Sequence, residues 1–274
     1  MPSLNSISVS QLYRIVGTPD APIIVDVRID EDFVDDPYFI PSSFRYPFEA
    51  IGDLAAKQDL SGRKVVVVCQ KGLKLSEGAA AILRSAGVSA EHLEGGSFAW
   101  RDASLPKVPA DKLPQKNDRN QTVWVTRHRP KIDRIACPWL IRRFIDPSAQ
   151  FLFVSPSQVE GVVDRFKATP FDVEGSFWSH RGDRCSFDTM LEELGLETDA
   201  LLRLATIVRG ADTNRHDLAP EAAGLLAASL GLSRMYRDDL QQLEAGMGLY
   251  DAFYRWSRDA TEEGHDWPSS SKKA

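Results

Sequence analysis

The chain has 274 residues, enough for two domains of ordinary size, and its 43% hydrophobic and 26% charged residues are typical of a globular protein. Its net charge of −6 argues against a general nucleic-acid-binding surface. No apolar run reaches membrane-spanning length, and residues 1–11 lack the features of a signal peptide. Because three cysteines do not make a disulfide framework, we expect a cytoplasmic protein without a membrane partner.

The first part of the chain shows alternating signals for helices and strands. Helical spacing predicts helices at 8–16, 51–60 and 75–86, and apolar runs predict strands at 23–27, 65–68 and 88–93. The acidic stretch 30–36 is typical of a solvated loop. The four valines at 65–68 suit a strand that is buried on both faces of a parallel sheet.

Cys69 stands where the valine strand ends, and a six-residue loop leads from it to the next helix. Backbone N–H groups in such a loop can turn inward and form a cup of positive potential at the helix N-terminus. These amides, together with Lys71 and Lys74, favour the thiolate and predict a reactive cysteine. The alternative is a structural cysteine, because free cysteine is among the most buried residue types.

Three motifs in this region resemble a rhodanese (thiosulfate sulfurtransferase-like) domain. The loop 69–74 resembles the active loop of that family, 24–28 its early Asp-x-Arg strand motif, and 93–100 its closing Leu-Glu-Gly-Gly-x-x-x-Trp signature. The resemblance covers residues 1–108 and implies an α/β domain with a parallel sheet flanked by helices. It also implies that no cofactor is required.

The resemblance assigns roles to individual residues. It implies that Cys69 is catalytic, that Asp26 and Arg28 support the loop, and that substrate is bound by Gln70, Lys71, Gly72, Leu73 and Lys74. Gln70 and Lys74 replace the usual arginines, so a guanidinium fork for an anion is missing and thiosulfate is expected to be a poor substrate. The related phosphatases need an arginine where this chain has Leu75, which argues against that activity.

A polar segment without apolar periodicity, 109–121, is predicted to be a linker. The second domain is expected at 122–260, followed by a polar tail at 261–274. Strands are predicted at 122–126, 151–154 and 169–173, and helices at 134–145, 187–194, 200–208, 220–230 and 238–256. This pattern indicates a mostly helical α+β domain with a small sheet.

The second domain resembles the C-terminal domain of chromate-resistance protein B. The matching segments are 124–127, 131–141, 170–173, 180–188 and 207–212. The resemblance implies a link to chromate resistance and makes chromate a candidate ligand. It does not by itself assign a chemical role to any residue.

Carboxylates and imidazoles in the loops of this domain could converge on a divalent metal. The candidate ligands are Asp133, His180 and Asp212, and such mixed nitrogen and oxygen ligation suits iron, manganese or zinc. Their spacing is not that of a compact metal motif, so the prediction rests on residue type and loop position. The alternative for His180 is a histidine satisfied by hydrogen bonds or exposed to solvent.

Two further features of the second domain allow more than one interpretation. Cys137 and Cys185 are either acceptor thiols for sulfur carried by Cys69 or small buried hydrophobic residues. A dense positive patch is either a solvated face or an oxyanion site for chromate, sulfate or phosphate. Its members are Arg127, Arg129, Lys131 and Arg134.

The leading hypothesis is a sulfurtransferase linked to chromate resistance. Cys69 would take sulfane sulfur from thiosulfate or another small sulfur donor such as a persulfide, and then pass it to a thiol acceptor. The alternative hypothesis is a metal- or oxyanion-binding sensor protein with little turnover. A transcription regulator is not supported, because no helix-turn-helix with basic recognition residues is evident, so no nucleic-acid partner is expected.

Overall fold

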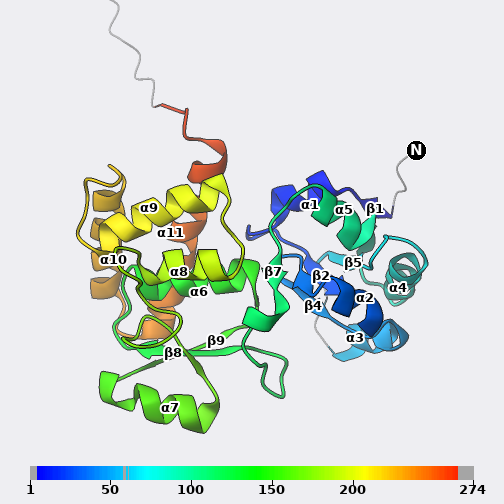
Figure 1. Ribbon diagram of the computed structural model, residues 1–274, viewed down its shortest axis with the longest axis horizontal. Coiled ribbons are helices and arrows are strands. Elements are labelled where there is room, and N and C mark those ends of the chain that lie inside the picture. Colours follow the sequence, from blue (N-terminus) through cyan, green and yellow to red (C-terminus); the bar gives the residue numbers. More distant parts are fainter. Residues whose placement is uncertain (1–4, 58–59, 61, 265–274) are drawn as a thin grey trace, which may run out of the picture.

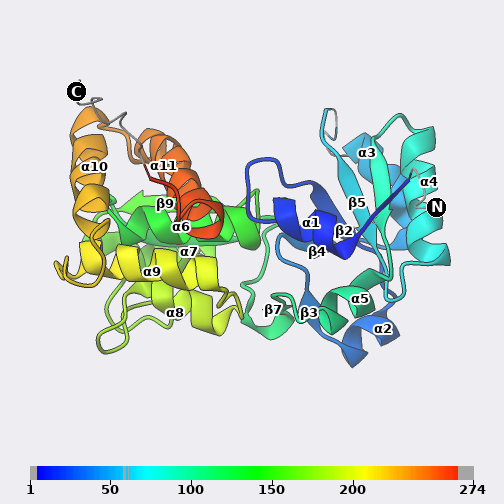
Figure 2. The same cartoon turned by 90° about the horizontal axis from the view of Figure 1, so that it is seen from above.

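The computed structural model describes residues 5–57, 60 and 62–264, which form two domains lying side by side along the longest axis of the molecule (Figures 1 and 2). Most of the predicted polar tail, residues 265–274, lies outside the described residues. Within them, no helix is both long enough and apolar enough to cross a membrane.

The first domain is built on a five-stranded sheet in which every neighbouring pair of strands is parallel. The strand order is β1-β6-β5-β2-β4, which places the valine strand β5 at the centre. The elements are β1 (Ser6–Ile7), α1 (Val9–Ile15), β2 (Ile23–Asp26), α2 (Asp30–Asp35), β3 (Tyr38–Phe39), β4 (Ser43–Arg45), α3 (Ile51–Lys57), β5 (Val65–Val68), α4 (Lys74–Ser85), β6 (Ala90–Leu93), α5 (Gly96–Asp102) and β7 (Val108–Pro109).

Two segments of the first domain differ from the sequence prediction. The acidic stretch expected to be a loop contains helix α2, whose first turn carries Asp30, Glu31 and Asp32, where negative charge favours a helix N-terminus. The predicted linker is also partly ordered. It starts next to β7, which pairs with β3, and it includes a 3-10 helix at Ala110–Lys112.

The second domain combines a three-stranded parallel sheet, in the order β10-β8-β9, with a group of packed helices. Helix α7 covers one face of the sheet, and α6 lies on the other (Figure 1). The elements are β8 (Val123–Arg127), α6 (Asp133–Phe144), β9 (Gln150–Val154), α7 (Val159–Phe166), β10 (Thr169–Pro170), α8 (Ser186–Glu193), α9 (Asp199–Asp212), α10 (Ala222–Met235) and α11 (Asp239–Asp259). The α+β class predicted for this half is confirmed, although α7 was not predicted.

Of the three hydrophobic clusters among the described residues, one includes side chains of both domains. At the seam, the backbone N–H of Ser42 donates a hydrogen bond to the carbonyl oxygen of Phe144 at 2.5 Å. The ring of Phe144 lies so close to Gly17 that a Cβ added there would be 2.2 Å from its Cζ atom. The ion pair between Lys112 and Glu193, 2.7 Å long, adds a polar contact between the 3-10 helix Ala110–Lys112 and helix α8.

The close approach of Gly17 and Phe144 makes a testable prediction about the domain contact. Gly17 and Gly87 both have left-handed backbones, with φ of 77° and 82°, but only Gly17 has a neighbour within 4 Å of an added Cβ. Gly87→Ala should lower the free energy of unfolding by about 1–2 kcal/mol, because alanine is strained in a left-handed backbone. Gly17→Ala should lower the free energy of unfolding by about 1–3 kcal/mol more than Gly87→Ala does, because the ring of Phe144 must move to make room for the added methyl group. Urea unfolding of both variants measures the difference, and equal losses would contradict a tight seam.

Candidate functional site

Cys69 follows the central strand β5 directly and is 4% exposed. Its Sγ lies 3.1 Å from the hydroxyl oxygen of Ser76, in the first turn of α4. The C-terminal end of a buried parallel strand is the edge at which α/β domains place reactive groups. The structure thus puts the thiol at the place where the sequence predicted it.

Glycines hold the loop after Cys69 in close contact with the segment that precedes α5. A Cβ at Gly72 would lie 2.4 Å from the carbonyl oxygen of Leu93, and one at Gly96 would lie 2.2 Å from the carbonyl oxygen of Cys69. The N–H of Ser97 also donates to that Cys69 carbonyl at 3.0 Å. Only glycine permits these approaches at positive φ, so the segment 93–100 supports the Cys69 loop.

The backbone N–H groups of the Cys69 loop take no part in the backbone hydrogen bonds of the described part of the domain. Within the described residues, none of the N–H groups from Gln70 to Lys74 donates a hydrogen bond to a backbone carbonyl. Lys71 and Lys74 are exposed beside them. Such uncommitted amides next to a thiol are the arrangement that favours bound anions and thiolates.

Asp26 and Arg28, predicted to support the Cys69 loop, pair with each other at the end of strand β2. They form a buried ion pair of 2.5 Å, and Arg28 donates further hydrogen bonds to the carbonyl oxygens of Asp36 and Tyr38. Within the described residues, neither side chain forms a hydrogen bond with the loop. The hydrogen bonds of Arg28 therefore fasten the segment between α2 and β3, and Asp26 lies beside Val68, the residue before Cys69, in the sheet.

In the second domain, four side chains from different segments meet at one point. Asp133 begins α6, Asp172 follows β10, His180 precedes α8 and Asp212 ends α9. The Nε2 atom of His180 lies 3.5 Å from Asp133 Oδ2, 3.3 Å from Asp172 Oδ1 and 3.3 Å from Asp212 Oδ2. Asp133, His180 and Asp212 each offer one ligand atom within 4.8 Å of the others. These are the three residues named as candidate metal ligands from the sequence.

Asp133 is the deepest member of this acidic cluster, with an exposed fraction of 1%. Its Oδ2 accepts a hydrogen bond from the N–H of Ser186 at 2.6 Å, but its Oδ1 is buried without any partner. Burial, reinforced by the charges of Asp212 and Asp172, raises the pKa of Asp133 well above its usual value. An unpartnered buried carboxylate oxygen is costly for a protein to keep, which points to a functional use.

The same carboxylates act on His180, whose side chain is 40% exposed. Hydrogen bonds to Asp172 and Asp212 raise the pKa of His180 to about 10. Burial alone would raise the pKa of Asp172, but the hydrogen bond from His180 and the charges of Arg134 and Arg127 lower it overall. In this form of the protein, the imidazolium therefore offsets the negative charge that the cluster concentrates.

Unusual backbone conformations surround the cluster. Ile132, a β-branched residue directly before Asp133, has φ of 39°, and Asp172 has φ of 50°. β-branched residues rarely adopt positive φ, and such strain gathers at functional sites when the surrounding fold holds it in place. The hydroxyl of the buried Tyr250 donates to the Ile132 carbonyl at 2.9 Å and holds this turn.

The predicted positive patch is divided between two places. Arg127 and Arg134 both contact Asp172 Oδ2, at 3.1 and 3.2 Å, and Lys131 lines the same hollow. Arg129 instead donates to the Ser233 carbonyl at 2.6 Å and fastens the region between α10 and α11. Arg129 is therefore not part of the candidate oxyanion site, which is a correction.

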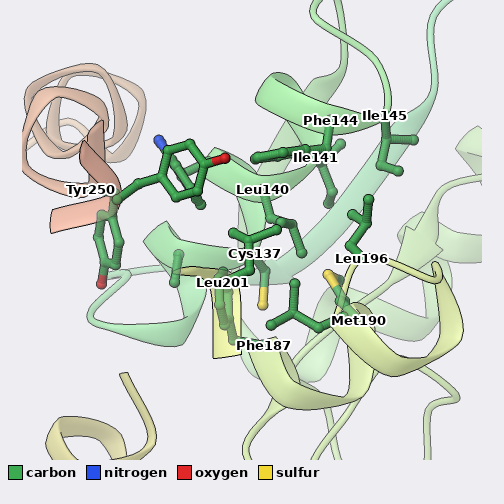
Figure 3. Packing of buried hydrophobic residues seen from close by; sticks show 14 of the residues in the cluster. Cys137, Leu140, Ile141, Phe144, Ile145, Phe187, Met190, Leu196, Leu201 and Tyr250 are labelled. Carbon is green, nitrogen blue, oxygen red and sulfur yellow. The ribbon is translucent and has the colours of Figure 1, made fainter. Parts of the chain in front are cut away.

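The two cysteines of the second domain are buried. The thiol of Cys137 lies among apolar side chains of α6, α8 and α9 (Figure 3). Burial raises the pKa of both the Cys137 and the Cys185 thiol well above the usual value. Thiols that are buried and protonated are poor acceptors, so the structure favours small hydrophobic residues over the predicted acceptor role.

Sequence reasoning did not single out Asp172 as a site residue. It lies within one of the matching segments, 170–173, and an isolated aspartate at the end of a short strand was the only further signal. Its role becomes evident only from its contacts with His180, Arg127 and Arg134.

Comparison with known families identifies both domains. Residues 8–103 match the family model of the rhodanese-like domain, which agrees with the parallel α/β sheet. The first domain is therefore a rhodanese-like domain. Residues 124–257 match the family model of the C-terminal domain of ChrB, so the second domain is a ChrB C-terminal domain. Both resemblances predicted from the sequence are confirmed.

Two curated proteins resemble parts of the chain. Protein ChrB of Cupriavidus metallidurans is 40% identical over 133 residues, which make up 48% of this chain and 39% of that protein. An uncharacterised protein of Synechocystis is 38% identical over 96 residues, or 35% of this chain and 51% of that protein. The chain thus spans between about two fifths and one half of the length of these relatives.

Solved structures of rhodanese-like proteins also resemble this chain. A rhodanese-related protein from Thermoplasma volcanium is 24% identical, and the match covers 38% of this chain and 97% of that one at a TM-score of 0.33. A rhodanese-like domain protein from Staphylococcus aureus is 28% identical, with 35% of this chain and 91% of that one covered at a TM-score of 0.32.

The acidic cluster predicts an unusual response to mutation. Asp133→Asn removes one of three clustered negative charges, so it should stabilise the protein in the presence of a chelator by about 1 kcal/mol. Asp251→Asn provides a matched control, because Asp251 pairs with Arg143 at 2.7 Å. The free energy of unfolding of this control should fall by about 1–3 kcal/mol, because the guanidinium of Arg143 loses its partner. Urea unfolding compares the two variants, and a similar loss in both would contradict electrostatic strain in the cluster.

Proposed function

We propose that this protein is a sulfurtransferase in which Cys69 carries a sulfane sulfur atom as a persulfide. The observation that supports this most is the position of the thiol beside a loop whose amides, from Gln70 to Lys74, are uncommitted among the described residues. These donors suit the negative charge of a thiolate and of the terminal sulfur of a persulfide. The rhodanese-like domain supports the same chemistry.

In the proposed cycle, the Cys69 thiolate attacks the sulfane sulfur of the donor. A bond forms between Sγ and that sulfur while the donor bond breaks, and the leaving group, sulfite if the donor is thiosulfate, departs with the electron pair. An acceptor thiolate then attacks the terminal sulfur and releases the Cys69 thiolate. The hydroxyl of Ser76 lies 3.1 Å from Sγ and donates to the Leu73 carbonyl oxygen at 3.2 Å, so it would turn from that carbonyl to donate to the anionic sulfur.

The loop composition favours a particular donor. Lys71 and Lys74 supply point charges, but no arginine offers two parallel hydrogen bonds to an oxyanion. A low-molecular-weight persulfide needs less oxyanion recognition than thiosulfate does, so it is the preferred donor in this proposal. We link the activity to chromate resistance through the ChrB C-terminal domain and the similarity to Protein ChrB.

Substitution of the nucleophile tests the sulfurtransferase proposal. Cys69→Ser should lower sulfur transfer by about three orders of magnitude, because an alcohol cannot carry sulfane sulfur at this position. Cys185→Ala should retain transfer, because that thiol is buried in the second domain. Thiocyanate release in the presence of cyanide measures turnover, and peptide mass analysis locates the added sulfur. Full activity in the Cys69 variant would refute the proposal.

A second candidate function, divalent metal binding, is favoured by the acidic cluster of the second domain. Ligands at about 2.0–2.1 Å from a tetrahedral ion are separated from one another by about 3.4 Å. The separations of 3.3 and 3.5 Å from His180 Nε2 to the carboxylates of Asp212 and Asp133 agree with that spacing. Asp133 also carries a second buried oxygen, Oδ1, that has no hydrogen-bond partner among the described residues.

The donor set fits iron, manganese or zinc, and Asp133, His180 and Asp212 would hold the ion. Such an ion supplies Lewis acidity and a fixed positive charge when bound. Asp172 Oδ1 lies 3.3 Å from the same Nε2 atom that would hold the ion, and its Oδ2 contacts Arg127 and Arg134, so Asp172 stands between the ligand set and the guanidinium groups.

Metal analysis tests this second function. His180→Ala and Asp212→Ala should each lower the affinity for Mn²⁺ or Zn²⁺ by about 100-fold or more, because each removes one of three ligands. His128→Ala is the control, since His128 is exposed and lies outside the cluster. Equilibrium dialysis followed by elemental analysis measures the affinity. Unchanged binding in both ligand variants would rule out this site.

A further inference from the structure

Three cationic side chains surround the acidic cluster and line the same open hollow. The hollow has a volume of about 470 Å³, and Arg127, Lys131 and Arg134 lie on its wall together with His180 and Asp212. Sequence reasoning treated the metal ligands and the positive patch as separate candidates. The structure places them side by side.

The three cations differ in how far they are committed to the protein. Arg134 donates to the carbonyl oxygens of Arg127 and His128 and contacts Asp172, so it belongs to the framework of the site. Arg127 is 44% exposed and, among the described residues, donates only through Nη2, to Asp172. Lys131 is exposed. Arg127 and Lys131 therefore have N–H donors that form no hydrogen bond among the described residues, and both side chains line the hollow.

The net formal charge of the metal-loaded site would favour binding of an anion. The carboxylates of Asp133, Asp172 and Asp212 cancel the three cationic side chains in formal charge. If a divalent ion is bound and the imidazole of His180 is neutral, the net charge of the site is +2, which is the charge of the ion. A small dianion would neutralise them, and spare guanidinium and ammonium donors suit its oxygens.

We propose that this hollow binds a small oxo-dianion, with the metal centre on one side and the donors of Arg127 and Lys131 on the other. This inference rests on the proposed metal centre, which it deepens by naming a ligand class. The hollow extends past the charged groups to Ala211 and Leu226. It therefore has space for an inorganic dianion or for the phosphate group of a small organic molecule.

The experiment uses the full chain loaded with Mn²⁺, with molybdate and phenyl phosphate as redox-inert probes. At least one probe should bind the loaded protein about tenfold or more tightly than the metal-free protein, as measured by calorimetry. Tighter molybdate binding would identify an inorganic dianion, and tighter phenyl phosphate binding an organic one.

Arg127→Gln and Lys131→Gln should each weaken probe binding about tenfold while the Mn²⁺ content stays unchanged. Arg129→Gln provides a matched control from the same loop, because its guanidinium is held at Ser233 and not at the hollow. It should leave probe affinity unchanged.

The outcomes separate the two proposals. Failure of the wild-type protein to bind Mn²⁺ would refute the metal centre and this inference with it. Normal Mn²⁺ binding with probe affinity that is independent of the metal would refute the inference alone. Equal losses in the Arg127, Lys131 and Arg129 variants would also refute it, because they would indicate general charge attraction and not a defined site.

Discussion

The buried helix α6 is the constraint on which the second domain depends. Nine of its residues are buried, and the indole of Trp139 packs against Phe187, Tyr250 and Tyr254. The helix cannot shift without opening this aromatic core, in which close packing resists displacement. Its first residue, Asp133, is thereby held at the bottom of the acidic cluster, and its last residue, Phe144, is held against the rhodanese-like domain. One packed element thus positions both the candidate site and the domain contact.

In the rhodanese-like domain, contacts between backbone atoms hold the loop after Cys69 in position. Its central strand is buried on both faces, and the loop after it is supported by Gly72 and Gly96, where side chains would collide with neighbouring backbone atoms. The N-terminal turn of α5 donates to the carbonyl oxygens of Cys69 and Gln70. These hydrogen bonds use the carbonyl groups of Cys69 and Gln70, and within the described residues the N–H groups of the loop donate to no backbone carbonyl. The proposed persulfide chemistry needs such donors.

The two proposed sites attract anions by different physical means. The Cys69 loop uses backbone dipoles, which carry partial charges and suit a sulfur anion bonded to the protein. The hollow of the second domain uses full charges from Arg127 and Lys131 next to carboxylates that suit a cation. Retention of the unpartnered Asp133 oxygen and the strained Ile132 backbone in a well-packed domain is consistent with selection for binding and not for stability alone.

The sequence by itself determined the α/β class of the first domain and the position of Cys69, because a buried strand, a loop and a helix are recorded in neighbouring residues. It also supplied the residue types of the candidate metal ligands. Only the tertiary structure decided that Asp133, His180 and Asp212 meet, that Asp172 joins them, and that Arg129 does not. It likewise showed to which carbonyl oxygens Arg28 donates and that Cys137 is buried. These outcomes depend on contacts between segments far apart in the chain, whose geometry local patterns do not encode.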